Sequence, residues 1–156
     1  MDFYSFMTQS KLLLRIVVAC ICGCIIGYER ESRNKGAGIR THAIVSLAAA
    51  LIMIVSKYGF SDIPDYDASR VAAQIVSGIG FLGAGIIFVR NNSISGLTTA
   101  AGVWATAGIG MAVGSGLYYI GVVTAFFIVL AQILLHQEVF TGKEHSDSKG
   151  YPDHRF

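Results

Sequence analysis

Charged residues are scarce in this sequence: Asp, Glu, Lys and Arg together make up 14% of the chain, whereas hydrophobic residues make up 53%. The charges gather in short segments between long apolar runs, and no aspartate or glutamate lies inside such a run. A formal net charge of +2 is too small to indicate a nucleic-acid partner. The mean hydropathy of +0.57 is well above that of an ordinary soluble domain, so the composition predicts an integral membrane protein.

Groups of residues that carry catalysis are also missing. The sequence shows no Ser, His and Asp set, no paired carboxylates and no His and Cys spacing typical of zinc, so we expect neither an enzyme nor a bound cofactor. The three cysteines, Cys20, Cys22 and Cys24, lie two positions apart. On a helix this spacing places Cys20 and Cys24 on one face and Cys22 on another, which excludes a thiolate metal site built from them.

Five apolar runs are long enough to cross a hydrocarbon core that is roughly 30 Å thick. They are residues 12–28, 41–58, 71–89, 97–113 and 117–135. The sequence therefore predicts an all-α integral membrane protein, with a bundle of five transmembrane helices in residues 1–136. The tail, residues 137–156, is polar and has no apolar periodicity, so we expect it to be largely disordered.

The basic residues predict the orientation of the chain. Residues 29–40 form the most charged segment, and its basic residues predict a cytoplasmic loop by the positive-inside rule. Five spans then place the N-terminus outside and the tail, which is also basic, in the cytoplasm. Arg15 lies one turn inside the first run, and we expect its side chain to extend to the headgroups.

Polar residues at the ends of the runs are candidate contact sites. They are Glu29, Arg30, Arg40, Thr41, His42, Arg70 and Gln74. A charge that directly adjoins a span costs a few kcal/mol if it is drawn inward unpaired. We therefore expect Glu29 to form an ion pair with an arginine of the same face, and Arg40 is the favoured partner.

One acidic loop is a weak candidate for a metal site. Asp62, Asp65 and Asp67 carry the hard oxygen ligands that Mg²⁺ or Ca²⁺ prefers, but three carboxylates in a loop are usually only solvated, so we expect no metal. Arg70 and Gln74 follow this loop at the start of the third run. In a transporter, these residues and the loop would form an outer vestibule.

Glycines recur in the third and fourth runs. Gly78, Gly80 and Gly83 satisfy the spacing G-x-G-x-x-G, but they lie within an apolar run and no acidic residue follows about twenty positions on, so nucleotide binding is not expected. Small residues allow membrane helices to approach closely, which favours packing. The predicted packing residues are Ser77, Gly78, Gly80, Gly83, Gly85, Gly96, Thr98, Thr99, Gly102 and Trp104. A broken helix that lines a polar cavity, as in some transporters, is the alternative.

Four stretches carry a resemblance to a known family. They are GYERE at Gly27 to Glu31, AGIRTHAIVSLAAAL at Ala37 to Leu51, SRVAAQIVSGIGFLGAGII at Ser69 to Ile87 and GLTTAAGVWATAGIGMAVGSG at Gly96 to Gly116. With these stretches the sequence closely resembles the MgtC/SapB family of bacterial inner-membrane proteins. It looks like the short, SapB-type branch, without the ACT-like C-terminal domain of longer members.

The resemblance implies a five-helix membrane bundle in the bacterial cytoplasmic membrane. The family is associated with growth in low magnesium and with survival inside host cells. The resemblance implies a non-catalytic role in magnesium homeostasis, through contact with a membrane ATPase such as a P-type magnesium pump or the ATP synthase. The glycine faces predict a homodimer or a partner helix, and membrane lipids are expected partners. A magnesium transporter or channel subunit is the alternative function.

Overall fold

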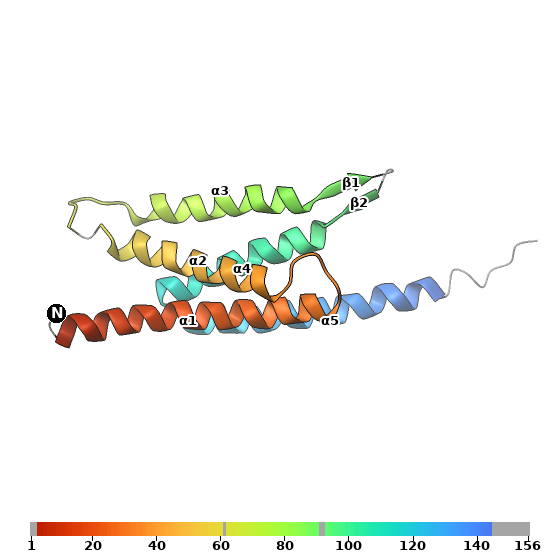
Figure 1. The fold of residues 1–156 in the computed structure, drawn as a ribbon, viewed down its shortest axis with the longest axis horizontal. Coiled ribbons are helices and arrows are strands. Elements are labelled where there is room, and N and C mark those ends of the chain that lie inside the picture. Colours follow the sequence, from red (N-terminus) through yellow and green to blue (C-terminus); the bar gives the residue numbers. More distant parts are fainter. Residues whose placement is uncertain (1–2, 61, 91–92, 145–156) are drawn as a thin grey trace, which may run out of the picture.

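The described residues of the chain fold into five helices and one short β-hairpin (Figure 1). A computed structural model describes the backbone of residues 3–60, 62–90 and 93–144, and the side chains of residues 7–60, 62–89 and 93–135. The elements in chain order are α1 (Phe3–Ser32), α2 (Ile39–Tyr58), α3 (Ala68–Ile86), β1 (Phe88–Arg90), β2 (Ser93–Ser95), α4 (Leu97–Ser115) and α5 (Tyr118–Glu144). Within the described residues, five helices are long and apolar enough to cross a membrane, as predicted.

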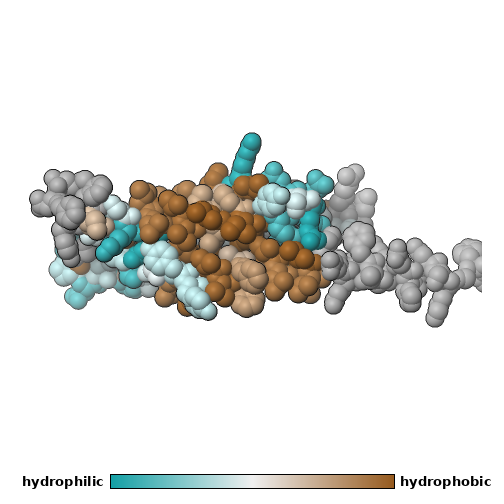
Figure 2. All heavy atoms as spheres, turned by 90° about the horizontal axis from the view of Figure 1, so that it is seen from below, coloured by the Kyte–Doolittle hydropathy of each residue, from teal (hydrophilic) through white to brown (hydrophobic). Residues whose placement is uncertain are grey.

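Helix α4 forms the centre of the bundle. It contacts all four other helices, and 56% of its most apolar stretch is buried, against 11% for α3 and for α5. Ile109 and Val113 of α4 pack with Ala19 and Ile26 of α1 in the main core cluster. Figure 2 shows the consequence on the outside, where a continuous apolar band covers one face and polar side chains gather toward the two ends.

Glycines of α1 and α4 allow these two helices to lie close to α2. On α1, a Cβ atom added to Gly27 would lie 2.5 Å from the Cα atom of Ile39 at the start of α2. On α4, a Cβ atom added to Gly114 would lie 2.7 Å from the carbonyl oxygen of Ala50. Side chains at these glycines would force the helices apart, so backbone contact at small residues defines this part of the bundle.

The end of the third predicted span is wrong. The run from 71 to 89 was expected to be one helix, but α3 ends at Ile86 and Phe88–Arg90 form strand β1, which pairs antiparallel with β2. Val89 lies opposite Ile94, and β-branched pairs of this kind favour a strand. Gly96 then adopts φ +88, a left-handed conformation that lets the chain turn directly into α4.

Helices α1 and α5 are longer than predicted. The first span was placed at 12–28, but α1 extends from Phe3 to Ser32, because hydropathy marks the apolar stretch and not the helix ends. Helix α5 continues to Glu144, beyond the predicted boundary at 136. The remainder of the predicted disordered tail, residues 145–156, lies outside the described residues.

Candidate functional site

A buried ion-pair cluster lies at the end of α1. Glu29 is 7% exposed and Arg30 is 3% exposed. Glu29 Oε2 accepts a hydrogen bond of 2.7 Å from Arg30 Nε, and Glu29 Oε1 lies 2.5 Å from Arg33 Nε. The predicted partner Arg40 is exposed on the first turn of α2 and is not part of the cluster. Glu29 therefore pairs with Arg30 of its own helix and with Arg33, which lies one turn further on at i+4, directly after the end of α1.

The chain turns sharply between α1 and α2, directly beside this cluster. Asn34 adopts φ 54, a left-handed conformation that asparagine tolerates, and this residue follows the end of α1. Glu31 Oε2 then accepts a hydrogen bond of 2.9 Å from the backbone N–H of Ile39. Glu31 thus satisfies a free donor at the N-terminus of α2, where Gly38 supplies no side-chain cap.

A polar contact joins α2 and α4 inside the bundle. His42 is fully buried, and its Nδ1 lies 2.8 Å from Thr106 Oγ1. Because Thr106 donates its only hydrogen to the Gly102 carbonyl oxygen at 2.8 Å, the Nδ1–H of His42 must be the donor to Thr106. Nε2 of His42 is then an acceptor with no hydrogen-bond partner among the described residues. This contact fixes the tautomer of His42 and the register of the two helices.

Gly102 brings the α5 residue Gln132 close to this contact. A Cβ atom on Gly102 would lie 3.4 Å from Gln132 Nε2 and 3.7 Å from His42 Cε1. Gln132 Oε1 is buried and has no hydrogen-bond partner among the described residues. Predicted residues His42 and Gly102 therefore meet a residue of α5 that the sequence did not single out.

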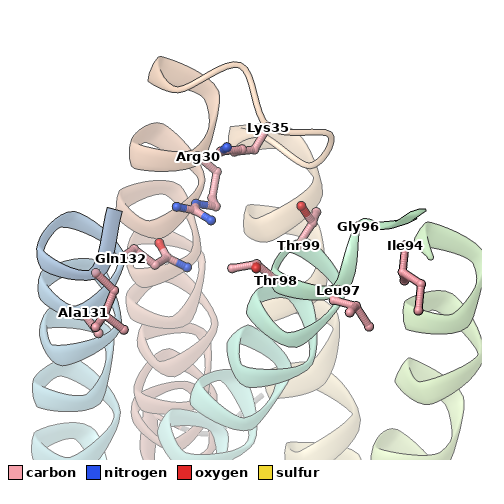
Figure 3. Close-up of a pocket in the computed structure, with 10 residues that line it drawn as sticks. Arg30, Lys35, Ile94, Gly96, Leu97, Thr98, Thr99, Ala131 and Gln132 are labelled. Carbon is pink, nitrogen blue, oxygen red and sulfur yellow. The ribbon is translucent and has the colours of Figure 1, made fainter. Parts of the chain in front are cut away.

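A pocket of about 580 Å³ opens above Gln132 (Figure 3). Arg30 and Lys35 lie at its upper side, and Thr98 and Thr99 at the start of α4 lie across from them. Leu97, Ile94, Ala131 and Leu135 supply its apolar walls. The structure thus brings four predicted residues, Arg30, Gly96, Thr98 and Thr99, to one cavity with a basic upper side.

A second, open groove of about 770 Å³ lies at the opposite end of α3. Its lining includes Asp65, Asp67, Arg70 and Gln74, so most of the predicted outer residues do lie together. Among the described residues, no group of three or more His, Cys, Asp or Glu side chains lies close enough together to hold a metal ion. Asp67 Oδ1 instead accepts a hydrogen bond of 2.9 Å from the backbone N–H of Ser69, and hydrogen bonding to Ser69 lowers the pKa of the Asp67 carboxyl.

Comparison with known proteins identifies the family. The sequence profile of the MgtC family matches residues 16–139. The chain belongs to the MgtC family. It is 48% identical over 136 residues to "Putative magnesium transporter YhiD" of Escherichia coli (strain K12), which covers 84% of this chain and 63% of YhiD. No solved structure matches the chain.

Two other relatives are named MgtC and SapB. The chain is 42% identical over 131 residues to MgtC of Salmonella typhimurium (strain LT2), across 84% of this chain and 55% of that protein. It is 38% identical over 133 residues to SapB of Bacillus subtilis (strain 168), across 81% of this chain and 57% of SapB. The chain therefore spans less than two thirds of the length of these three relatives.

The predicted packing residues of this MgtC-family chain fall into two groups. Gly83, Thr99 and Gly102 are buried, and a Cβ atom on Gly83 would meet Ala100 of α4 at 3.8 Å. The other group lies on the surface, where added Cβ atoms at the α3 glycines would meet no described atom within 4 Å. The exposed predicted residues are Ser77, Gly78, Gly80, Gly85, Thr98 and Trp104, and Thr41 and Gly96 are half-buried.

Sequence reasoning missed the role of Arg15. Its side chain was expected to extend to the headgroups, but Nη1 donates to the carbonyl oxygen of Gly114 and to the hydroxyl of Tyr58, each at 3.0 Å. A cation at this position stabilises the C-terminal end of α4. Lys57 acts similarly on the carbonyl oxygen of Ser115. The observed partner at the end of α4 is a backbone carbonyl group far away in the sequence, and no sequence spacing reveals such a contact.

Sequence reasoning also missed the four glycines that lie against the backbone of α2. They are Gly23 and Gly27 of α1 and Gly110 and Gly114 of α4, and none of them was among the predicted packing residues. The signal that could have found them is the small-residue spacing of four, with Gly23 before Gly27 and Gly110 before Gly114.

Proposed function

We propose that this protein is a non-catalytic, multi-pass protein of the bacterial cytoplasmic membrane that serves magnesium homeostasis by contacting another membrane protein. The name of YhiD refers to magnesium transport, and the family match supports a membrane role for this chain. The single observation that supports contact as the mechanism is an uncovered small-residue face of α3, on which Ser77, Gly80 and Ala84 lie three and four positions apart and are all exposed.

This face has the properties of a helix-packing surface. Membrane helices associate where small residues allow backbones to approach, since lipid tails are as apolar as leucine and provide no hydrophobic driving force. Only 11% of the most apolar stretch of α3 is buried, so most of its surface is available for a partner. The expected partner is a membrane ATPase, such as a P-type magnesium pump or the ATP synthase, and the alternative is a second copy of this chain.

The buried charges favour contact over transport of a dication. Mg²⁺ keeps much of its hydration shell and needs oxygen ligands, usually carboxylates, to replace any part of it. Among the described residues, the one buried carboxylate is Glu29, and it is compensated by Arg30 and Arg33. No free acidic side chain is thus offered to a cation in the described part of the spans.

The deciding experiment compares two glycine variants of equal added bulk. Gly80→Leu places a large side chain on the α3 face, whereas Gly108→Leu places one at an exposed glycine of α4 that is equally free of described neighbours. Both are expressed in a strain that lacks the gene, and growth in low magnesium and the proteins that co-purify are measured. We expect Gly80→Leu to lose growth support and the partner, and Gly108→Leu to keep both.

The outcome that contradicts contact as the mechanism is a Gly80→Leu protein that inserts, folds and retains full activity. Magnesium flux into liposomes tests the alternative directly, with the membrane potential controlled and an Arg70→Ala variant beside the natural chain. Flux above empty liposomes that Arg70→Ala abolishes would make the protein a transporter, with the groove beside Arg70 at its entrance.

A further inference from the structure

The pocket at Arg30 carries an excess of positive charge. A single carboxylate, Glu29, lies between the guanidinium groups of Arg30 and Arg33, so among the described residues one positive charge of this cluster remains uncompensated. Lys35 adds another at the pocket's edge, and Glu31, the other acidic residue of this segment, is engaged with the backbone of Ile39. The local balance therefore favours an anion over a cation.

Arg30 also has donors to spare. Its side chain is only 4% exposed, yet the Nε atom alone is hydrogen-bonded, to Glu29, and no described residue accepts from its two terminal nitrogens. Figure 3 shows the guanidinium group directed into the cavity above Gln132. A buried guanidinium with free donors is strongly suited to a phosphate group, which accepts two parallel hydrogen bonds from it.

The start of α4 faces the same cavity from the other side. Gly96 is the N-cap and provides no side-chain hydrogen bond, and the first backbone bond at this end is from Ala100 N–H to the Gly96 carbonyl oxygen. The N–H groups of Leu97, Thr98 and Thr99 therefore have no partner within the helix. Free N–H groups and the positive end of the helix dipole favour a bound anion at this place.

The walls of the pocket indicate what carries the anion. Ile94, Leu97 and Leu135 are 58%, 55% and 65% exposed, so the cavity opens sideways through large apolar side chains. Leu97 is also the first residue of a candidate membrane span, and the apolar run of α5 ends in the sequence at Leu135, before the polar residues His136 and Gln137. The opening therefore lies where the hydrocarbon of the bilayer meets the headgroups, with donors above and apolar surface below.

We propose that this pocket binds the phosphate group of an anionic phospholipid. The phosphate lies between Arg30, Lys35 and the N–H groups at the start of α4, and an acyl chain lies along Leu97 and Leu135. Free phosphate offers the same chemistry to the donors but leaves the exposed apolar walls uncovered, so the lipid fits the whole cavity better. The inference does not rest on the proposed contact function.

The test is native mass spectrometry of the delipidated full chain in detergent. Phosphatidylglycerol, phosphatidylcholine or inorganic phosphate is added, and bound molecules are counted. Lys35→Ala removes a charge from the pocket, whereas the control Arg40→Ala removes one from the same end of the bundle outside it. We expect phosphatidylglycerol to bind about tenfold more tightly than phosphatidylcholine, and Lys35→Ala to weaken this binding about tenfold, the loss expected for one charge-assisted contact.

A third variant keeps the test clear of folding defects. Arg30→Lys retains the charge beside Glu29 but loses the planar pair of donors, so it is expected to fold and to bind phosphatidylglycerol more weakly. Equal loss in Lys35→Ala and Arg40→Ala would reduce the effect to surface charge and overturn the proposal. Equal binding of the two lipids would also overturn it, and saturation by inorganic phosphate with displacement of the lipid would assign the pocket to the free ion.

Discussion

Glu29 is the residue whose replacement has the clearest expected cost. Glu29→Gln leaves Arg30 buried without its counter-charge, and breaking one side of a buried pair is strongly destabilising. We expect the free energy of unfolding in mixed micelles to fall by about 3 kcal/mol. The control Arg40→Gln, at an exposed position outside the cluster, should leave this free energy unchanged.

A double-mutant cycle separates the observed pair from the predicted one. Glu29 and Arg33 are in contact, so their coupling energy should be about 1 kcal/mol, whereas Glu29 and Arg40 should show none. Measured coupling between Glu29 and Arg40 in place of Arg33 would contradict the geometry of the cluster. The sequence did indicate an ion pair for Glu29. The i+4 spacing identifies its partner Arg33 correctly, whereas choosing the partner by its position at the boundary of a span led to Arg40.

Asp67 gives the chain a pH-dependent helix cap. Its carboxyl has a pKa below the ordinary value of 3.8 because it is hydrogen-bonded to Ser69 at the start of α3. A lowered folded-state pKa stabilises the protein above the unfolded value, and this contribution is lost as pH falls through the folded-state value. Asp67→Asn should therefore be less stable than the natural chain at neutral pH, with a difference that disappears in acid.

Unfolding curves of the two proteins at descending pH measure that difference. The matched control is Asp62→Asn in the same loop, because the Asp62 carboxylate has no hydrogen-bond partner among the described residues. A constant difference between natural chain and Asp67→Asn at all pH values would rule out the charged cap.

At the scale of elements, the glycines of this chain differ in what surrounds them, and substitutions at them should differ in their effect on stability. Gly27→Ala would place a Cβ atom 2.5 Å from the Cα atom of Ile39, and α1 and α2 would have to separate, so we expect a loss of about 2 kcal/mol in unfolding free energy. Gly80→Ala meets nothing among the described atoms and should stabilise α3 slightly, by less than about 1 kcal/mol. Equal effects of the two substitutions in mixed micelles would contradict this division.

The elements themselves were predicted unevenly. Apolar length was enough to find all five helices, because a span must satisfy its backbone internally and therefore be helical. The β-hairpin was missed because Phe88 and Val89 are as apolar as the helix before them, so hydropathy has no boundary at Ile86. The change depends on pairing between Val89 and Ile94, which a scan for apolar length does not consider.

At the scale of the whole molecule, hydropathy does not reveal which helix is central. Helix α4 has a hydropathy of 1.3 and is the most buried, whereas α5 has 2.2 and is among the least buried. In a bilayer the most apolar helix is free to face lipid, and small or weakly polar residues such as Thr106 are placed inside. The sequence therefore indicated which residues pack closely, but not that His42 and Gln132 meet beside Gly102 in the interior.

The orientation of the bundle is the remaining whole-molecule prediction. The segment between α1 and α2 holds Arg33 and Lys35, and Arg40 lies on the first turn of α2, so this end of the bundle should lie in the cytoplasm and the loop with Asp65 should lie outside. Green fluorescent protein fused after Lys35 should fluoresce, and alkaline phosphatase fused after Asp65 should be active, since each reporter works on one side only. Exchanging the reporters is the control and should silence both. The reverse pattern would place the basic pocket at Arg30 in the outer leaflet. A phospholipid bound there would then have to come from the outer leaflet instead of the inner one.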